Sequence, residues 1–119
     1  MRCAFGPGPF RMKHLLLIAL ALITISAAPA TKTFRGVISD DMCARTGHAA
    51  MRMGPTDAEC TTACVMVHGA SYVLADSKTV YLLSDQRTPE KFAAQKVAVV
   101  GTLDAKTGTI QVSSIAAAR

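Results

Sequence analysis

The sequence contains no tryptophan, and only 5% of its 119 residues are aromatic. The content of glycine and proline is modest, with eight and five residues, and no segment of the chain repeats another. The low glycine and proline content excludes a collagen-like chain, and a 50% apolar composition excludes an intrinsically disordered one. Without repeats, a solenoid is excluded as well. The chain is therefore at most one small globular domain.

The N-terminal thirty residues have the parts of a secretory signal peptide. Basic residues precede an apolar run at 15–25, and small residues follow this run up to Ala30. The run has 11 residues, well short of the roughly 20 that a membrane-spanning helix needs. We predict that 1–30 is a signal peptide cut after Ala30, with either Met1 or Met12 as the translation start. The product, 31–119, would be periplasmic or secreted, with no stable membrane anchor.

Removal of this segment changes the charge of the chain. Residues 31–119 carry ten basic and eight acidic side chains, so the net charge falls from +5 to +2. Four aromatic residues remain in this part: Phe34, Tyr72, Tyr81 and Phe92. Binding of single-stranded nucleic acid needs stacked aromatics in a basic groove, so we expect no nucleic-acid partner.

The exported part reads as strands and one main helix. Thr56 and Glu59 fit a capping box, and Gly69 fits a helix end, which together predict a helix over 57–68. Bulky and β-branched runs predict five strands at 33–39, 71–75, 79–83, 96–103 and 109–115. The fold class is then mainly β with one helix (α+β). Residues 42–69, a long loop and the helix, lie between the first and second strands.

Several motifs resemble those of a known family. They are Gly36-Val-Ile-Ser-Asp-Asp-Met-Cys43, His48, Cys60-x3-Cys64, Gly69-Ala-x-Tyr-Val-Leu74 and Lys96-Val-x-Val-x-Gly-Thr102. The chain is similar to small exported bacterial proteins of a domain family of unknown function, whose C-terminal half resembles OB-fold barrels. The resemblance implies that 31–119 is a single domain with a small five-stranded OB-like barrel. It implies no activity.

The cysteines and histidines are the candidate site. Cys60, Cys64 and His68 are spaced by four residues on the predicted helix, and Cys43 and His48 lie in the preceding loop. Three cysteines and one histidine suit a tetrahedral zinc site, and nearby methionines extend the choice to copper. These methionines are Met42, Met51, Met53 and Met66.

Two other interpretations of the same cysteines stay open. In an oxidising compartment, a disulfide of Cys43 with Cys60 or Cys64 would fix the loop to the helix and leave one thiol over. Alternatively, Cys60 lies in the first helical turn, where the helix dipole favours thiolate, and could exchange with a disulfide. No thioredoxin-like pattern surrounds the cysteines, so an enzyme is the less favoured class.

Other polar and apolar residues have structural interpretations. Asp40 and Asp41 are expected to form a turn, Met66 to fill the core, and Tyr72 and Tyr81 to pair across two strands. His68 in the last helical turn also suits the free carbonyls there. The sequence thus predicts an exported binding or interaction module for a small ligand or protein, with possible zinc or copper binding.

Overall fold

The computed structural model describes residues 23, 25 and 27–119. Most of the predicted signal peptide therefore lies outside the described residues. The strands are β1 (Lys32–Asp40), β2 (Tyr72–Ala75), β3 (Val80–Leu83), β4 (Lys96–Asp104) and β5 (Thr109–Ala117). One α-helix, α1 (Asp57–His68), and two short 3-10 helices, η2 (His48–Met51) and η3 (Thr88–Phe92), complete the described elements. The prediction of a mainly β fold with one helix is confirmed.

The five strands form one mixed sheet that closes on itself. Its order is β1-β2-β3-β5-β4, and β4 pairs back with β1. Four of the pairings are antiparallel, and β3 with β5 is parallel. β2 with β3 and β4 with β5 are consecutive strands that pair as antiparallel hairpins. Because the sheet closes, each strand is hydrogen-bonded to a neighbour on both of its sides over at least part of its length.

The interior of the sheet is filled by alternating apolar side chains. Val97 and Val99 of β4 are fully buried, whereas Ala98 and Val100, which alternate with them along the strand, are partly exposed. This alternation is typical of a strand with one buried face. The buried cluster consists of Ile38, Tyr72, Leu74, Leu83, Val97, Val99 and Ile110. Each fully buried aliphatic side chain of this kind contributes about 1.5–3 kcal/mol, so this cluster is the main source of fold stability.

A bulge bends β4 at its pairing with β5. The register shifts between Val100 and Gly101. A Cβ atom at Gly101 would collide with the carbonyl oxygen of Gln111 on β5. Glycine is therefore required here because the two backbones approach closely at the bend.

The helix begins and ends where its local sequence dictates. The Thr56 hydroxyl accepts the Glu59 N–H at 3.2 Å, and the Glu59 carboxylate accepts the Thr56 N–H at 3.1 Å. Gly69 adopts a left-handed φ of 69° and donates its N–H to the Cys64 carbonyl. The capping box and the glycine end satisfy backbone groups that a helix leaves free, so the predicted bounds of 57–68 are correct.

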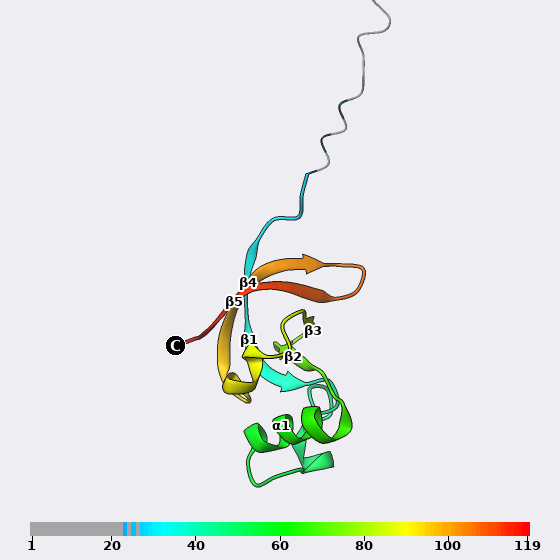
Figure 1. Cartoon of the computed structure of the whole chain (residues 1–119), viewed down its shortest axis with the longest axis vertical. Helices are drawn as coiled ribbons and strands as arrows, with labels where there is room; N and C mark the ends of the chain where they lie inside the picture. Colours follow the sequence, from blue (N-terminus) through cyan, green and yellow to red (C-terminus); the bar gives the residue numbers. More distant parts are fainter. Residues whose placement is uncertain (1–22, 24, 26) are drawn as a thin grey trace, which may run out of the picture.

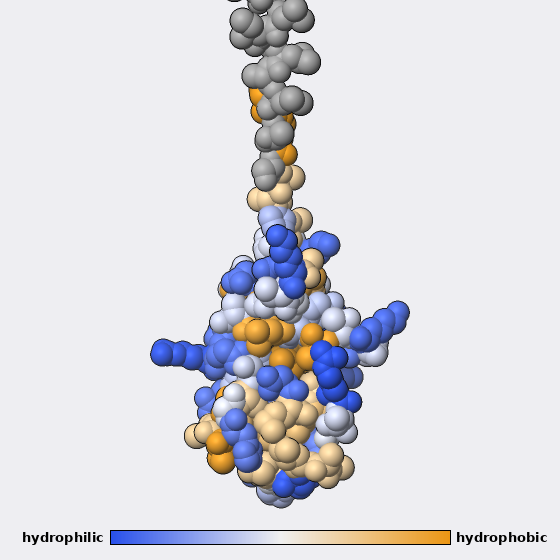
Figure 2. Space-filling model, turned by 90° about the vertical axis from the view of Figure 1, so that its right-hand side faces the viewer, coloured by the Kyte–Doolittle hydropathy of each residue, from blue (hydrophilic) through white to orange (hydrophobic). Residues whose placement is uncertain are grey.

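The loop and α1 lie together at one end of the sheet (Figure 1). There β1 ends and β2 begins, and the two strands are paired as far as Asp40 opposite Tyr72. Asp41 continues this link, because it exchanges backbone and side-chain hydrogen bonds with Ser71 at 3.0 and 3.1 Å. Weakly hydrophobic residues gather at the surface of this end, whereas charged side chains project around the sheet (Figure 2). The sheet thus provides a rigid base for the loop and helix.

Three expectations need correction. Tyr81 lies opposite Leu74 rather than Tyr72, and its ring packs against Phe34 at a centroid distance of 5.5 Å. The Met66 side chain is 75% exposed and does not fill the core. The predicted long loop that precedes the helix is not wholly irregular, because it contains η2. Within the described part of the chain, no helix is long and apolar enough to cross a membrane.

Candidate metal centre

The three cysteines of residues 31–119 come together beside α1. Cys43, Cys60 and Cys64 are 2%, 0% and 0% exposed and form a second buried cluster, separate from the core of the sheet. Met53 and Ala70 pack against it. All three are free thiols. The expectation that the loop cysteine reaches the two helical cysteines is confirmed.

Donor atoms of this region fall into two groups that share Cys43. In one, Cys43, His48 and Cys60 have donor atoms within 4.8 Å of one another. In the other, Asp40, Cys43 and Cys64 do. Two thiolate sulfurs bound to one zinc lie about 3.8 Å apart, as follows from tetrahedral geometry and a Zn–S distance near 2.3 Å. The observed spacing therefore needs little contraction to hold a metal ion.

Asp40 positions the loop cysteine. Its Oδ1 accepts the backbone N–H of Met42 at 3.1 Å and that of Cys43 at 2.9 Å, which forms the expected turn at the end of β1. Its other oxygen, Oδ2, is buried and has no hydrogen-bond partner. The sequence favoured a turn for Asp40 over a role in cation binding, so its place beside the sulfurs is new. The local signal for it was the spacing of three residues to Cys43, because an Asx-type turn brings that residue next to the carboxylate.

The loop brings His48 close to Cys60, and its backbone is hydrogen-bonded to the Cys60 thiol. The Cys60 thiol donates to the Met51 carbonyl at 3.2 Å and accepts the Met53 N–H at 3.4 Å, so the loop backbone folds over the first turn of α1. His48 begins η2 after Gly47, whose φ of 82° lies in the left-handed region that favours glycine. The Nδ1 atom of His48 is buried without a partner.

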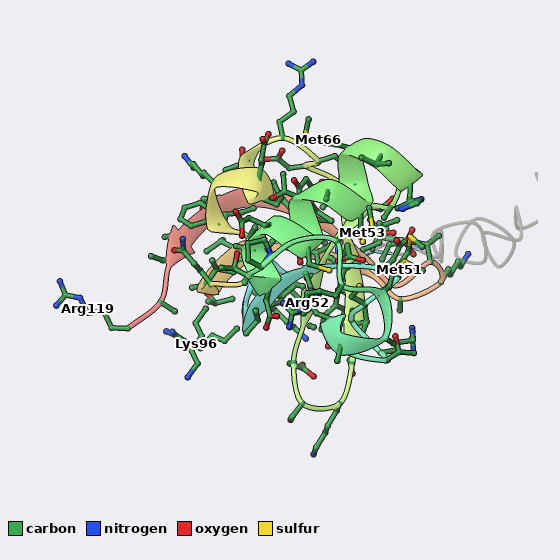
Figure 3. All side chains as sticks on the ribbon, turned by 90° about the horizontal axis from the view of Figure 1, so that it is seen from below. Met51, Arg52, Met53, Met66, Lys96 and Arg119 are labelled. Atoms are coloured by element: carbon green, nitrogen blue, oxygen red, sulfur yellow. The ribbon has the colours of Figure 1, made fainter. Side chains whose placement is uncertain are left out.

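His68 takes no part in either donor group, and most of the candidate methionine side chains are exposed. His68 is exposed and belongs to neither donor group. Eight residues of helix advance about 12 Å, so a residue two turns beyond Cys60 cannot share one ion with it. Met42 and Met51 are 36% and 41% exposed. Met66 lies apart from Met51 and Met53 (Figure 3).

The surroundings of Cys43 and Cys64 favour the protonated thiol in the absence of metal. Burial is the main cause that raises the pKa of Cys43 to about 12, and Asp40 and Cys64 add to it. Burial and Asp40 also raise the pKa of Cys64. Metal binding at this site must therefore release thiol protons, which makes the affinity weaker as the pH falls.

Comparisons with protein-family models, with curated proteins and with solved structures find no match to this chain. The resemblance to an exported domain family thus stays a prediction. The function has to be argued from the geometry of the site.

Proposed function

We propose that this protein binds a soft or borderline metal ion, zinc or copper(I), through Cys43, Cys60 and Cys64, with His48 as a further ligand. The observation that carries the proposal is the burial of three free thiols beside a histidine whose Nδ1 has no partner. Thiolate and imidazole are the ligands that structural zinc sites use, and thiolate also suits copper(I). Buried polar atoms without a partner are rare in native proteins, and a bound ion would satisfy them.

A disulfide is the alternative that the same proximity supports. The sulfur of Cys43 lies within 4.8 Å of the sulfur of Cys60 and also of that of Cys64, so oxidation could join Cys43 to either one and leave one thiol. Thiol exchange is less well supported, because a catalytic thiolate needs a low pKa and access to solvent. Here all three thiols are buried, and burial raises the pKa of two of them.

The wider setting of the site belongs to the same proposal. The closed order β1-β2-β3-β5-β4 is compatible with a small five-stranded OB-like barrel. The signal-like sequence before residue 31 supports action in the periplasm or outside the cell. On this proposal, the protein is a small exported binding module, and any further small-molecule or protein partner would meet the loop and α1.

The test is metal retention by the reduced protein, measured by native mass spectrometry and by competition with a chromophoric chelator. We expect zinc or copper(I) to be bound and to protect the thiols from alkylation. Cys43→Ser should abolish retention. His48→Ala should weaken binding by at least the roughly 10- to 100-fold that loss of an outer-shell partner costs.

His68→Ala is the matched control, because His68 is an exposed histidine outside both donor groups. It should bind metal as the unmodified protein does. Protein that retains neither metal would overturn the proposal. Alkylation of the protein as isolated, before any reductant is added, then distinguishes the alternatives, since a disulfide leaves one of Cys43, Cys60 and Cys64 to react and no disulfide leaves all three.

A further inference from the structure

The donor side chains of the site are too many for one tetrahedral ion. Five of them contribute: Asp40, Cys43, His48, Cys60 and Cys64. A structural zinc ion takes four ligands. The five also do not form one shell, because they divide into two triplets in which only Cys43 is common. A shared thiolate between two sets of donors is the arrangement that a bridged pair of ions requires.

Asp40 provides an independent observation that points to a cation. The residue is 0% exposed, yet its Oδ2 has no hydrogen-bond partner. The single ion pair among residues 23, 25 and 27–119 joins Arg52 to Asp57, so no side-chain cation accompanies Asp40. Two backbone N–H groups satisfy Oδ1, but a buried carboxylate with no cation beside it still carries a desolvation penalty. A metal ion bound beside Cys43 and Cys64 would remove this cost.

The charge of the ligands indicates how many ions are needed. When metal-bound, the three cysteines are thiolates and Asp40 is a carboxylate, while His48 binds as a neutral imidazole. If all five donors bind, one divalent ion leaves two negative charges buried without compensation, and two copper(I) ions leave the same excess. Two divalent ions neutralise the site. Because uncompensated buried charge is costly, the ligands favour a pair of zinc-like ions.

We propose that the site binds two divalent metal ions, bridged by the Cys43 thiolate. One ion is held by Cys43, His48 and Cys60, and the other by Asp40, Cys43 and Cys64. Each has three protein donors and a fourth position for water or another ligand. Loading releases the three thiol protons to solvent. This inference rests on the metal binding proposed above and specifies its stoichiometry and its preference for zinc over copper(I).

The experiment titrates Zn²⁺ into the reduced full chain without oxygen and counts bound ions by native mass spectrometry. We expect two ions at saturation. Asp40→Asn and His48→Ala should each bind one, because each removes a donor from a different triplet. Cys43→Ser should bind none tightly. With ¹¹³Cd²⁺ in place of zinc, two cadmium resonances with mutual coupling through the shared sulfur are expected.

Controls separate loss of a ligand from loss of folding. Asparagine at position 40 keeps an oxygen that can accept the Met42 and Cys43 N–H groups, and amide NMR spectra will verify the fold of each variant. Asp41→Asn is the matched control, because Asp41 is an exposed carboxylate whose Oδ1 accepts the Ser71 N–H. It should still bind two ions.

The two proposals fail differently. Saturation at one ion, unchanged by Asp40→Asn, would overturn the paired site and leave the proposed metal binding intact. Absence of any bound ion would overturn both. Two ions in the unmodified chain that persist in Asp40→Asn and in His48→Ala would place the second ion elsewhere and also reject the bridged pair.

Discussion

The two buried clusters of this protein differ in what holds them together. The cluster inside the closed sheet is made of aliphatic and aromatic side chains from all five strands, and these strands are linked by continuous backbone pairing. The cluster under α1 has only three cysteines, with Met53 and Ala70 packed against it. A small sulfur cluster buries far less apolar surface than the core of the sheet, so it contributes less to folding.

The two regions also differ in how well their buried polar atoms are hydrogen-bonded. Three buried side-chain atoms lack a hydrogen-bond partner in the part of the chain that the structure describes: Asp40 Oδ2, His48 Nδ1 and Thr61 Oγ1. All three belong to the end of β1, the loop or α1. Unsatisfied buried groups are tolerated mainly where a site uses them. The comparison teaches that the sheet supplies most of the buried apolar surface, whereas the end of β1, the loop and α1 hold the donor atoms that could bind a metal ion.

Truncation of the sheet core should give the largest effect on stability. Ile110 is fully buried on β5, and Ile110→Ala should cost about 2–5 kcal/mol in the free energy of unfolding, measured with urea. Leu82→Ala is the control, because Leu82 is 40% exposed on the neighbouring β3 and its loss should cost on the order of 0.5 kcal/mol. Equal losses for the two variants would contradict the assignment of the core.

Metal should stabilise the loop and α1 rather than the sheet. Free zinc at 100 times its dissociation constant should raise the free energy of unfolding by about 2.7 kcal/mol through linkage. Hydrogen exchange should slow at the amides of 41–64 and change little in β4 and β5. Cys43→Ser should lose the stabilisation and His68→Ala should keep it. Zinc that slows exchange only in the sheet would place binding elsewhere.

Loss of the helix cap should lower the stability of the protein by a smaller amount. Thr56→Ala removes the hydroxyl that accepts the Glu59 N–H, and should cost about 1 kcal/mol. Thr56→Ser keeps the hydroxyl and should recover most of this loss. Both are measured by urea unfolding of the metal-free protein. An alanine variant as stable as the original would indicate that the cap is redundant with the Cys60 packing.

Sequence alone predicted the elements well because their determinants are local. The bounds of α1 follow from Thr56, Glu59 and Gly69, which act within one turn of the helix ends. The strands run one or two residues beyond or inside their predicted limits, because pairing with a neighbouring strand sets where extended backbone stops. The approach of Cys43 to the helical cysteines was also predicted, since the spacing of Cys60 and Cys64 allowed one loop residue to reach both.

The rest of the site depends on contacts that no local pattern contains. Asp40 is buried because β1 pairs with β2 as far as Tyr72, which encloses one aspartate and leaves its neighbour Asp41 exposed. Periodicity placed His68 on the same stripe as the cysteines. The rise of the helix, however, carries it out of reach of the loop. Met66 lies on the exposed side of α1, because the side of this helix that is buried contains only Cys60, Thr61 and Cys64.

The smallest expected effect on stability comes from Asp85, an aspartate that follows β3 of the sheet. The hydroxyl and backbone N–H of Thr88, together with the Arg87 N–H, lower the pKa of Asp85 below its ordinary value of 3.8. A carboxylate with a lowered pKa stabilises the fold above the unfolded-state value, and this contribution is lost as the pH falls through the lowered pKa. Asp85→Asn cannot titrate, so below about pH 4 its free energy of unfolding should decline less steeply than that of the unmodified protein, as urea unfolding at several pH values will measure. Parallel curves would show that Asp85 has no such role, and that acid sensitivity must arise from other carboxylates.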